Sequence, residues 1–314
     1  MATSKARAPI MPSNPRDPTG TARKVAGATN AWARKMKQCA NVYIDLLEQI
    51  PVAPAVNARY EFRLVDDLLM ALLATADALL DGILLEGGAT RPWFSVQYVE
   101  PAYQQGTAQA FANLSQQSLS YRNSYESFSD LAQSQPYRLR VALVRAREFE
   151  EMKGITGQTK ADMTRVLTDG MARGKNVRVI AKELTEQAGI ETKRAKRIAQ
   201  TEIPMALRRA RWEESEQADE EHGMVHKLMH MSALMATTRK THADRHGKLY
   251  TREEVREWYS KDGNAINCHC GQVEVLIGDD GKPVVPGMVS RALAMYDRVR
   301  ARSDAPWTGK TGKT

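Results

Sequence analysis

Thr-Arg-Lys-Thr-His-Ala-Asp-Arg-His-Gly occupies residues 238–247, and Asn-Cys-His-Cys follows at residues 267–270. These two stretches hold two of the three cysteines and three of the six histidines of a 314-residue chain. Thiolate and imidazole groups are ligands that zinc prefers in proteins, and both also serve in catalysis. We therefore expect the specific chemistry of this chain at His242, His246, Cys268 and Cys270.

The spacing of these residues is compatible with a metal site but leaves alternatives open. His-x3-His places two imidazoles on one face of a helical turn, and Cys-x-Cys brings two thiols close together. Two nitrogens and two sulfurs at about 2.0–2.3 Å satisfy a tetrahedral zinc ion, so one structural zinc is a candidate cofactor. His269 competes as a ligand. Alternatively, the thiols pack under a loop while the histidines bond to the backbone, or the cysteines form a strained disulfide or redox pair.

The composition indicates a folded chain that suits a reducing environment. Apolar residues make up 42% of it, which supports a core, and three cysteines give no disulfide framework. The first residues lead into no apolar run, so no signal peptide is expected. The most apolar stretch, Leu64–Leu85, contains four aspartates, which are too costly inside a bilayer. It is therefore predicted to be a core helix, with no membrane as a partner.

The net charge of +8 is unevenly distributed. Residues 1–40 contain eight Lys and Arg against one acid, and residues 151–200 contain eleven against six. Residues 41–150 have the opposite balance, with eight bases and thirteen acids. Basic blocks of this kind are typical of contact with nucleic acid or an acidic protein face, although they also serve as solvated surfaces.

Breaks in composition divide the chain into four parts. A proline-rich arm (1–22) is expected to be extended and flexible, and residues 23–153 form a helical region. Residues 154–278 combine helices with two short strands, and residues 279–314 form a helix and a flexible tail. The predicted helices are 24–50, 58–86, one or two within 104–135, 137–153, 159–172, 177–187, 191–221, 251–260 and 291–302, and the strands begin near Val225 and Gln272. The fold class is thus α+β and predominantly α-helical.

The helix predicted at 191–221 has a narrow stripe of small side chains that includes Ala195 and Ile198. Glu202 falls on the same face, where a carboxylate needs a partner, and Arg239 is the candidate. A local alternative makes Thr201 the N-cap of a new helix with Glu202 and Pro204 in its first turn, because proline is tolerated near a helix start.

Three sequence elements, in order, resemble a known family. Arg194-Ala-Lys-Arg-Ile-Ala-Gln-Thr-Glu202 is similar to a helix of the phage head-morphogenesis family, the Mu protein F-like minor head proteins. Thr238, Arg239, His242 and Gly247 match its next element, and Asn267, Cys268 and Cys270 match its closing cysteine box. Gln200 and His269 stand where the family usually has arginine, Ile266 where it often has proline, and the aspartate that often precedes Thr-Arg is absent.

The resemblance implies a low-copy internal head protein of a tailed bacteriophage, without established enzymatic activity. Its implied partners are the portal protein, other capsid or scaffolding proteins and the packaged double-stranded DNA. The implied location is the capsid interior near the portal vertex, with host cytoplasm during assembly. The motif residues Ala195, Ile198, Glu202, Arg239, His242 and Gly247 are then structural, and no catalytic residue is assigned.

Two alternatives from other classes stay open at the level of sequence. One is a nuclease or toxin-like hydrolase centred on Arg239, His242 and His246, with the histidines acting on phosphate. The other is a non-specific DNA-binding protein that uses its basic blocks to contact phosphates without reading sequence.

Overall fold

The computed structural model describes residues 6–56, 59–63 and 66–309. In chain order the elements are α1 (Ala22–Glu48), β1 (Val52–Val56), β2 (Arg59–Phe62), α2 (Asp66–Leu84), the π-helix η1 (Ser95–Val99), α3 (Glu100–Gln117), α4 (Leu119–Arg122), α5 (Phe128–Gln133), α6 (Gln135–Ala172), α7 (Val177–His222), β3 (His226–Met231), α8 (Lys240–Ala243), β4 (Leu249–Tyr250), α9 (Arg252–Ser260), β5 (Gly271–Leu276), α10 (Gly287–Arg302) and the short 3-10 helix η2 (Pro306–Thr308). The predicted class, α+β and predominantly helical, is confirmed.

The chain forms two compact units, each built from segments that are distant in sequence. Unit 1 comprises residues 1–24, 99–141 and 200–314, and unit 2 comprises residues 25–98 and 142–199. The long helices α6 and α7 therefore each contribute residues to both units. Among the described residues, no helix has the length and apolar character needed to cross a membrane.

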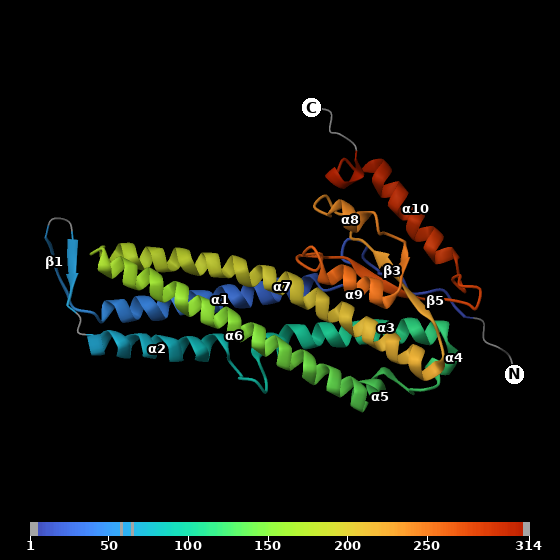
Figure 1. The fold of residues 1–314 in the computed structure, drawn as a ribbon, viewed down its shortest axis with the longest axis horizontal. Helices are drawn as coiled ribbons and strands as arrows, with labels where there is room; N and C mark the ends of the chain where they lie inside the picture. The colour runs from blue at the N-terminus through green and yellow to red at the C-terminus, as the bar shows by residue number, and fades with distance from the viewer. Residues whose placement is uncertain (1–5, 57–58, 64–65, 310–314) are drawn as a thin grey trace. The chain divides into compact units, whose positions relative to one another are not determined.

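Unit 2 is a bundle of long helices, in which α1, α2 and the adjoining halves of α6 and α7 run alongside one another (Figure 1). An aromatic cluster fills part of its core: the rings of Trp32 and Trp93 lie 4.8 Å apart, and those of Trp32 and Phe94 lie 5.7 Å apart. The hydroxyl of Tyr43 lies 2.9 Å from the Thr164 hydroxyl, which joins α1 to α6. Burial of these large rings contributes to the driving force for packing.

Three helix predictions in unit 2 were wrong in detail. The separate helices expected at 137–153 and 159–172 form the single helix α6. The helix expected at 58–86 begins only at Asp66, because residues 59–62 pair with β1 as a hairpin (residues 58, 64 and 65 lie outside the described residues). The break expected at Gly189 is absent, since α7 runs unbroken through it. A glycine costs a helix only about 1 kcal/mol, and the buried face that includes Leu184, Ala188 and Ala195 continues across it.

Unit 1 contains a three-stranded antiparallel sheet with strand order β4-β3-β5. β3 and β5 pair over six residues each, from His226 opposite Leu276 to Met231 opposite Gly271. Both strands were predicted from their alternating pattern. The expected helix at 251–260 is also confirmed as α9, where Thr251 and Glu254 form a reciprocal capping box.

Residues 6–21 form no helix or strand, as expected for a proline-rich arm, but hydrogen bonds hold them to unit 1. The amide of Arg7 donates to the carbonyl of Gln116, and that of Ile10 donates to Asn113 Oδ1 at 2.8 Å. Asp17 then accepts from the amides of Gly20, Thr21 and Ala22, so its carboxylate caps the start of α1. Residues 1–5 of the predicted arm and 310–314 of the predicted tail lie outside the described residues.

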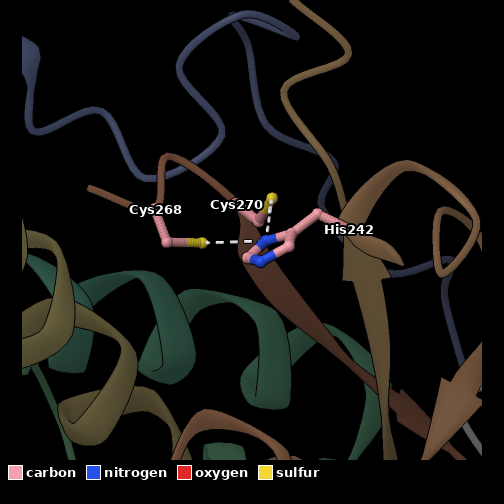
Figure 2. Close-up of side chains that lie close together, drawn as sticks. All are labelled: His242, Cys268 and Cys270. Atoms are coloured by element: carbon pink, nitrogen blue, oxygen red, sulfur yellow. Dashed lines mark hydrogen bonds between the residues drawn. The ribbon is translucent and has the colours of Figure 1, made fainter. Parts of the chain in front are cut away.

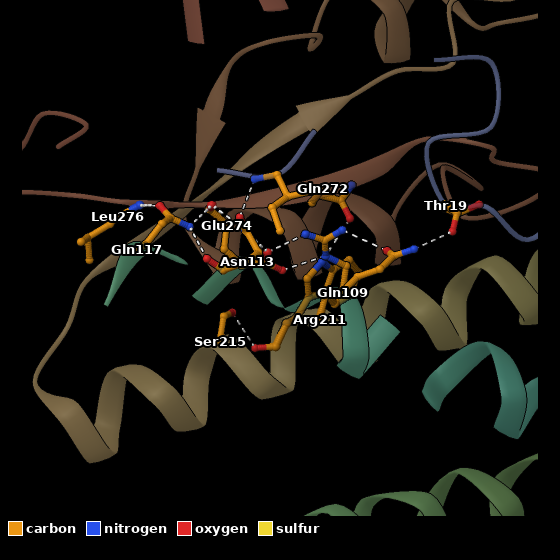
Figure 3. A network of polar contacts seen from close by, with 11 residues as sticks. Thr19, Gln109, Asn113, Gln117, Arg211, Ser215, Gln272, Glu274 and Leu276 are labelled. Carbon is orange, nitrogen blue, oxygen red and sulfur yellow. Dashed lines mark hydrogen bonds and ion pairs between the residues drawn. The ribbon is translucent and has the colours of Figure 1, made fainter. Parts of the chain in front are cut away.

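A buried polar network fixes the outer edge of β5 (Figure 3). Arg211 of α7 donates to both carboxylate oxygens of Glu274, at 2.8 and 2.5 Å. From α3, the Asn113 amide donates to the same carboxylate at 2.7 Å. Gln117 acts like a residue of a neighbouring strand, since its side chain donates to the Glu274 carbonyl and accepts from the Leu276 amide, both at 2.9 Å. Two backbone groups at this edge, the Glu274 carbonyl and the Leu276 amide, therefore have side-chain partners.

Gln117→Ala is expected to destabilise unit 1 by about 1–3 kcal/mol, because it leaves the part-buried Leu276 amide without its acceptor and removes one of the two side-chain donors to the Glu274 carbonyl. Urea unfolding monitored together with hydrogen exchange of the β5 amides measures this effect. Gln116→Ala is the matched control, since that side chain is half-buried and only its backbone carbonyl is used. Equal stability of the two variants would show that the Gln117 side chain does not hold the edge.

Candidate metal centre

His242 reaches the centre from α8, a single helical turn that follows the extended residue Arg239. Cys268 and Cys270 lie in the segment that enters β5. Asn267 precedes them with φ of 52°, a left-handed conformation that asparagine tolerates better than most residues. Its amide donates to the Thr201 hydroxyl of α7 at 3.3 Å. This bond joins the helical motif Arg194–Glu202 to the cysteine box at residues 267–270.

The three side chains converge on one small volume (Figure 2). His242 Nδ1 lies 3.4 Å from Cys268 Sγ and 3.6 Å from Cys270 Sγ, and all three ligand atoms lie within 4.8 Å of one another. A tetrahedral zinc ion with sulfur at about 2.3 Å and nitrogen at about 2.0–2.1 Å separates those two ligand atoms by about 3.5–3.6 Å. The spacing of the donors therefore fits a metal ion of this size.

A second layer of residues orients the two cysteines. Arg208 of α7 is fully buried and donates to the carbonyls of Cys268 and Cys270, at 3.1 and 2.9 Å. Its guanidinium lies 4.6 Å from the centre of the Tyr259 ring, and the Tyr259 hydroxyl lies 3.6 Å from Cys268 Sγ. Cys270 Sγ contacts the Ser232 hydroxyl at 3.7 Å. Such outer contacts fix the orientation and basicity of metal ligands.

The electrostatics of the pair favour one thiolate. A hydrogen bond from the Cys270 thiol holds the pKa of Cys268 well below its usual range, and the charge of Arg208 and the proximity of His242 act in the same direction against desolvation. The same hydrogen bond, with burial, raises the pKa of Cys270. A thiolate, unlike a thiol, is a competent metal ligand.

His246 does not join the group, although the sequence placed it among four ligands. Its Nδ1 lies 3.1 Å from the Ser232 amide and 3.2 Å from the Ser232 carbonyl, and its ring stacks on Tyr296. Burial lowers its pKa to about 4, so the ring is neutral. A spacing of four residues would align His242 and His246 on one face of a continuous helix. However, α8 ends at Ala243, so the two imidazoles do not share a helical face.

Arg239 also has a different role from the one expected. Its guanidinium donates to the backbone carbonyls of Gly263, Asn264 and Ile266 at 2.9–3.1 Å, and thereby holds the turn before the cysteine box. These donors go to carbonyls rather than to the carboxylate of Glu202. Glu202 itself is half-buried in the middle of α7, so the alternative in which Thr201 caps a new helix is wrong.

The remaining motif residues lie on packed surfaces. Ala195 is fully buried and Ile198 is half-buried, both in α7 within unit 2. Gly247 has φ of 75°, and its amide donates to the His230 carbonyl at 2.8 Å. A Cβ at this position would meet the backbone nitrogen and side chain of Leu293 at about 3.0 Å. Gly247 is thus required by backbone conformation and by the close approach of α10.

Gly247→Ala is expected to destabilise unit 1 by about 1–2 kcal/mol from the left-handed backbone alone, with a further cost from the contact with Leu293. Gly281→Ala is a matched control, because Gly281 has φ of 76° and open space around a Cβ. Thermal unfolding of both variants separates the two contributions. If Gly247→Ala is no more destabilising than Gly281→Ala, the contact with α10 has no energetic consequence.

A cavity of about 600 Å³ opens beside the three ligands. His242, Cys268 and Cys270 line it, and the rest of its wall includes Gln200, Thr237, Thr238, Arg239, Asp262 and His269. Among the described residues, the group that can hold a metal ion contains His242, Cys268 and Cys270 but not His269, although both histidines line the cavity.

The structure gives little support to a hydrolytic centre made of Arg239, His242 and His246. The guanidinium is engaged by carbonyls, one imidazole faces two sulfurs, and the other is bonded to the backbone of Ser232. A phosphate would need donors that converge on one accessible point. These three side chains do not provide one.

The arrangement of α7, α8 and the cysteine box can now be compared with known proteins. The family model described as phage Mu protein F like protein matches residues 161–273. These residues are a Mu F-like segment. The segment begins in α6 and ends in β5, so it contains the Arg194–Glu202 helix, Gly247 and all three candidate ligands. No curated protein and no solved structure matched the chain in the corresponding searches.

The matched residues contain the three motifs that indicated this family, so the motif prediction agrees with the match over residues 161–273. The Mu F-like segment supplies residues to both units, because α7 belongs to unit 2 up to Ala199 and to unit 1 from Gln200. Sequence reasoning missed Arg208 and Arg211, the two buried arginines of this segment. They lie beside the small residues Ala206 and Ala210 in α7, and a basic residue next to such a stripe was the available signal.

Proposed function

We propose that this protein is a minor head protein of a tailed bacteriophage that acts in head assembly, associates with the portal and is packaged inside the capsid with the DNA. The observation that carries the proposal is the Mu F-like match over residues 161–273, which contains all three motif elements in order. The location that follows is the capsid interior near the portal vertex. No enzymatic step is part of the proposal.

Exposed apolar side chains on α2 support contact with other capsid components. Leu68, Met70 and Leu79 are 41%, 67% and 48% exposed, and only Ala76, Leu80 and Leu84 of this helix are buried. Apolar surface of this kind on a helix is typical of regions that contact other proteins.

Mass spectrometry of purified heads, combined with chemical cross-linking, tests the proposal. We expect a few copies of the chain per head and cross-links between it and the portal protein. Heads that contain the portal and lack this chain at every stage of assembly would contradict the proposal.

The proposed DNA contact is supported by the basic surface of α7. Lys193 and Lys196 are exposed, and residues 151–200 have five more basic than acidic side chains, from eleven against six. Contacts of this type neutralise phosphates without reading bases.

Lys193→Gln together with Lys196→Gln is expected to weaken DNA binding and to reduce the salt dependence of the binding constant by a slope of about two. Fluorescence anisotropy with duplex DNA at several salt concentrations measures both quantities. Lys282→Gln, an exposed lysine outside the basic block, is the control. Unchanged salt dependence in the double variant would place the DNA contact elsewhere.

We also propose that the His242, Cys268 and Cys270 group holds one zinc ion. The distances between the donors and the buried thiolate support this choice of metal, because two sulfurs and an imidazole favour zinc over magnesium or calcium. Bound zinc would connect α8 to the segment that enters β5. Its role is then structural, as a link that closes the Mu F-like segment.

A further inference from the structure

Three protein ligands leave a tetrahedral metal ion one position short. His242, Cys268 and Cys270 supply one donor atom each, and the described part of the chain adds no fourth His, Cys, Asp or Glu within reach. His246 is held by Ser232, and His269 is outside the group. Structural zinc sites are usually closed by four protein ligands, whereas sites with three keep a position for an external ligand.

The three ligands contact packed protein side chains and also line an open cavity. Arg208, Tyr259 and Ser232 pack against the cysteines and are part of the protein interior. The cavity of about 600 Å³ lies against the same cysteines and His242 and is large enough for several water molecules. A fourth ligand can therefore reach the metal position from this cavity.

We infer that the centre is an open one, in which His242, Cys268 and Cys270 bind zinc and a small exogenous donor from the cavity completes the coordination. This inference rests on the proposed zinc. It differs from a closed four-ligand staple because the fourth ligand exchanges with the medium.

The lining of the cavity selects the class of donor. Two thiolates neutralise a divalent ion, so long-range electrostatic attraction for an anionic ligand comes from the wall. Arg239 provides a fixed positive charge there, and Thr237, Thr238 and Gln200 are polar residues of the same wall. Asp262, which is exposed, supplies the carboxylate among the described residues that line the cavity. The fourth position therefore suits water or a small monodentate anion.

Cobalt(II) substitution of the full-length protein tests the inference, with azide as the probe. Cobalt reports its coordination through visible absorption bands. We expect one equivalent of cobalt to bind with sulfur-to-metal charge-transfer bands, and azide to shift the visible bands with saturation. His269→Ala should retain one equivalent of cobalt and the same response to azide.

The outcomes separate the inference from the proposal on which it rests. Absence of cobalt and zinc binding overturns both the zinc proposal and the open centre. One equivalent of cobalt with bands that saturating azide leaves unchanged overturns the open centre and leaves the zinc proposal standing. Loss of metal in His269→Ala, with folding verified by circular dichroism, would identify His269 as the fourth ligand and would also overturn the open centre.

Discussion

Glu274→Gln is expected to destabilise unit 1 by about 3–5 kcal/mol, among the largest single effects in this protein. Both partners of the Arg211–Glu274 ion pair are buried, with side-chain exposures of 5% and 0%. Removing the carboxylate charge leaves the guanidinium in a low-dielectric interior without its counter-ion. One of the two side-chain oxygens would also become an amide donor, which removes the acceptor of either Asn113 or Arg211.

The double variant Arg211→Met with Glu274→Leu provides the control. Replacing a buried ion pair by apolar residues of similar size is often neutral or stabilising, so we expect it to recover most of the loss. Urea unfolding, with hydrogen exchange of the β3 and β5 amides as the local readout, measures all three proteins. A loss for Glu274→Gln of less than about 1 kcal/mol, the value typical of exposed pairs, would contradict the burial of this pair.

The same pair predicts a dependence of stability on pH. Burial alone would raise the pKa of Glu274, but the charge and hydrogen bonds of Arg211, with the hydrogen bond from Asn113, outweigh it and lower the pKa below 4.5. Because the folded pKa is depressed, this stabilisation is present above about pH 4.5 and is lost as the pH falls through the folded value. The acid branch of the stability curve should therefore be shallower in Glu274→Gln.

Cys268→Ala is expected to reduce bound zinc from about one equivalent to less than about a tenth, and to abolish the effect of zinc on thermal stability. A ligand that binds only the folded state adds about 4 kcal/mol of stability when its concentration is a thousandfold above its dissociation constant. That contribution should disappear with the ligand residue. Elemental analysis and thermal unfolding, with and without a chelator, measure the two effects.

Two other residues serve as controls for the metal. Cys39→Ala changes the third cysteine, which is buried in α1 of unit 2, and should leave the zinc content unchanged. His246→Gln should also retain the metal, whereas His242→Gln should lose it. Equal zinc loss in the two histidine variants would restore the four-ligand site that the sequence suggested.

The sequence predicted the elements whose local signals agree with their packing. The strands expected near Val225 and Gln272 and the helix expected at 251–260 correspond to β3, β5 and α9. The hairpin before α2 was missed because an apolar run continues directly from it, so its short alternation in residues 59–62 was absorbed into the helix prediction. The continuity of α7 depends on contacts along its whole buried face, which no local signal at Gly189 reveals.

Part of the candidate site could be predicted from residue type and spacing alone. Cys268, Cys270 and His242 were identified by residue type and spacing, and the structure brings them together. His246 was included because a helical turn was assumed beyond Ala243, where α8 ends. Arg208 was missed because it lies sixty residues from the carbonyls that it binds, and only the packing of α7 against the cysteine box creates that contact.

X-ray absorption spectroscopy at the zinc edge, on purified full-length protein, tests the claim that His242, Cys268 and Cys270 form one metal centre most directly. The structure predicts two sulfur ligands at about 2.3 Å and two nitrogen or oxygen ligands at about 2.0–2.1 Å. Protein without zinc, or zinc surrounded only by nitrogen and oxygen, would contradict it.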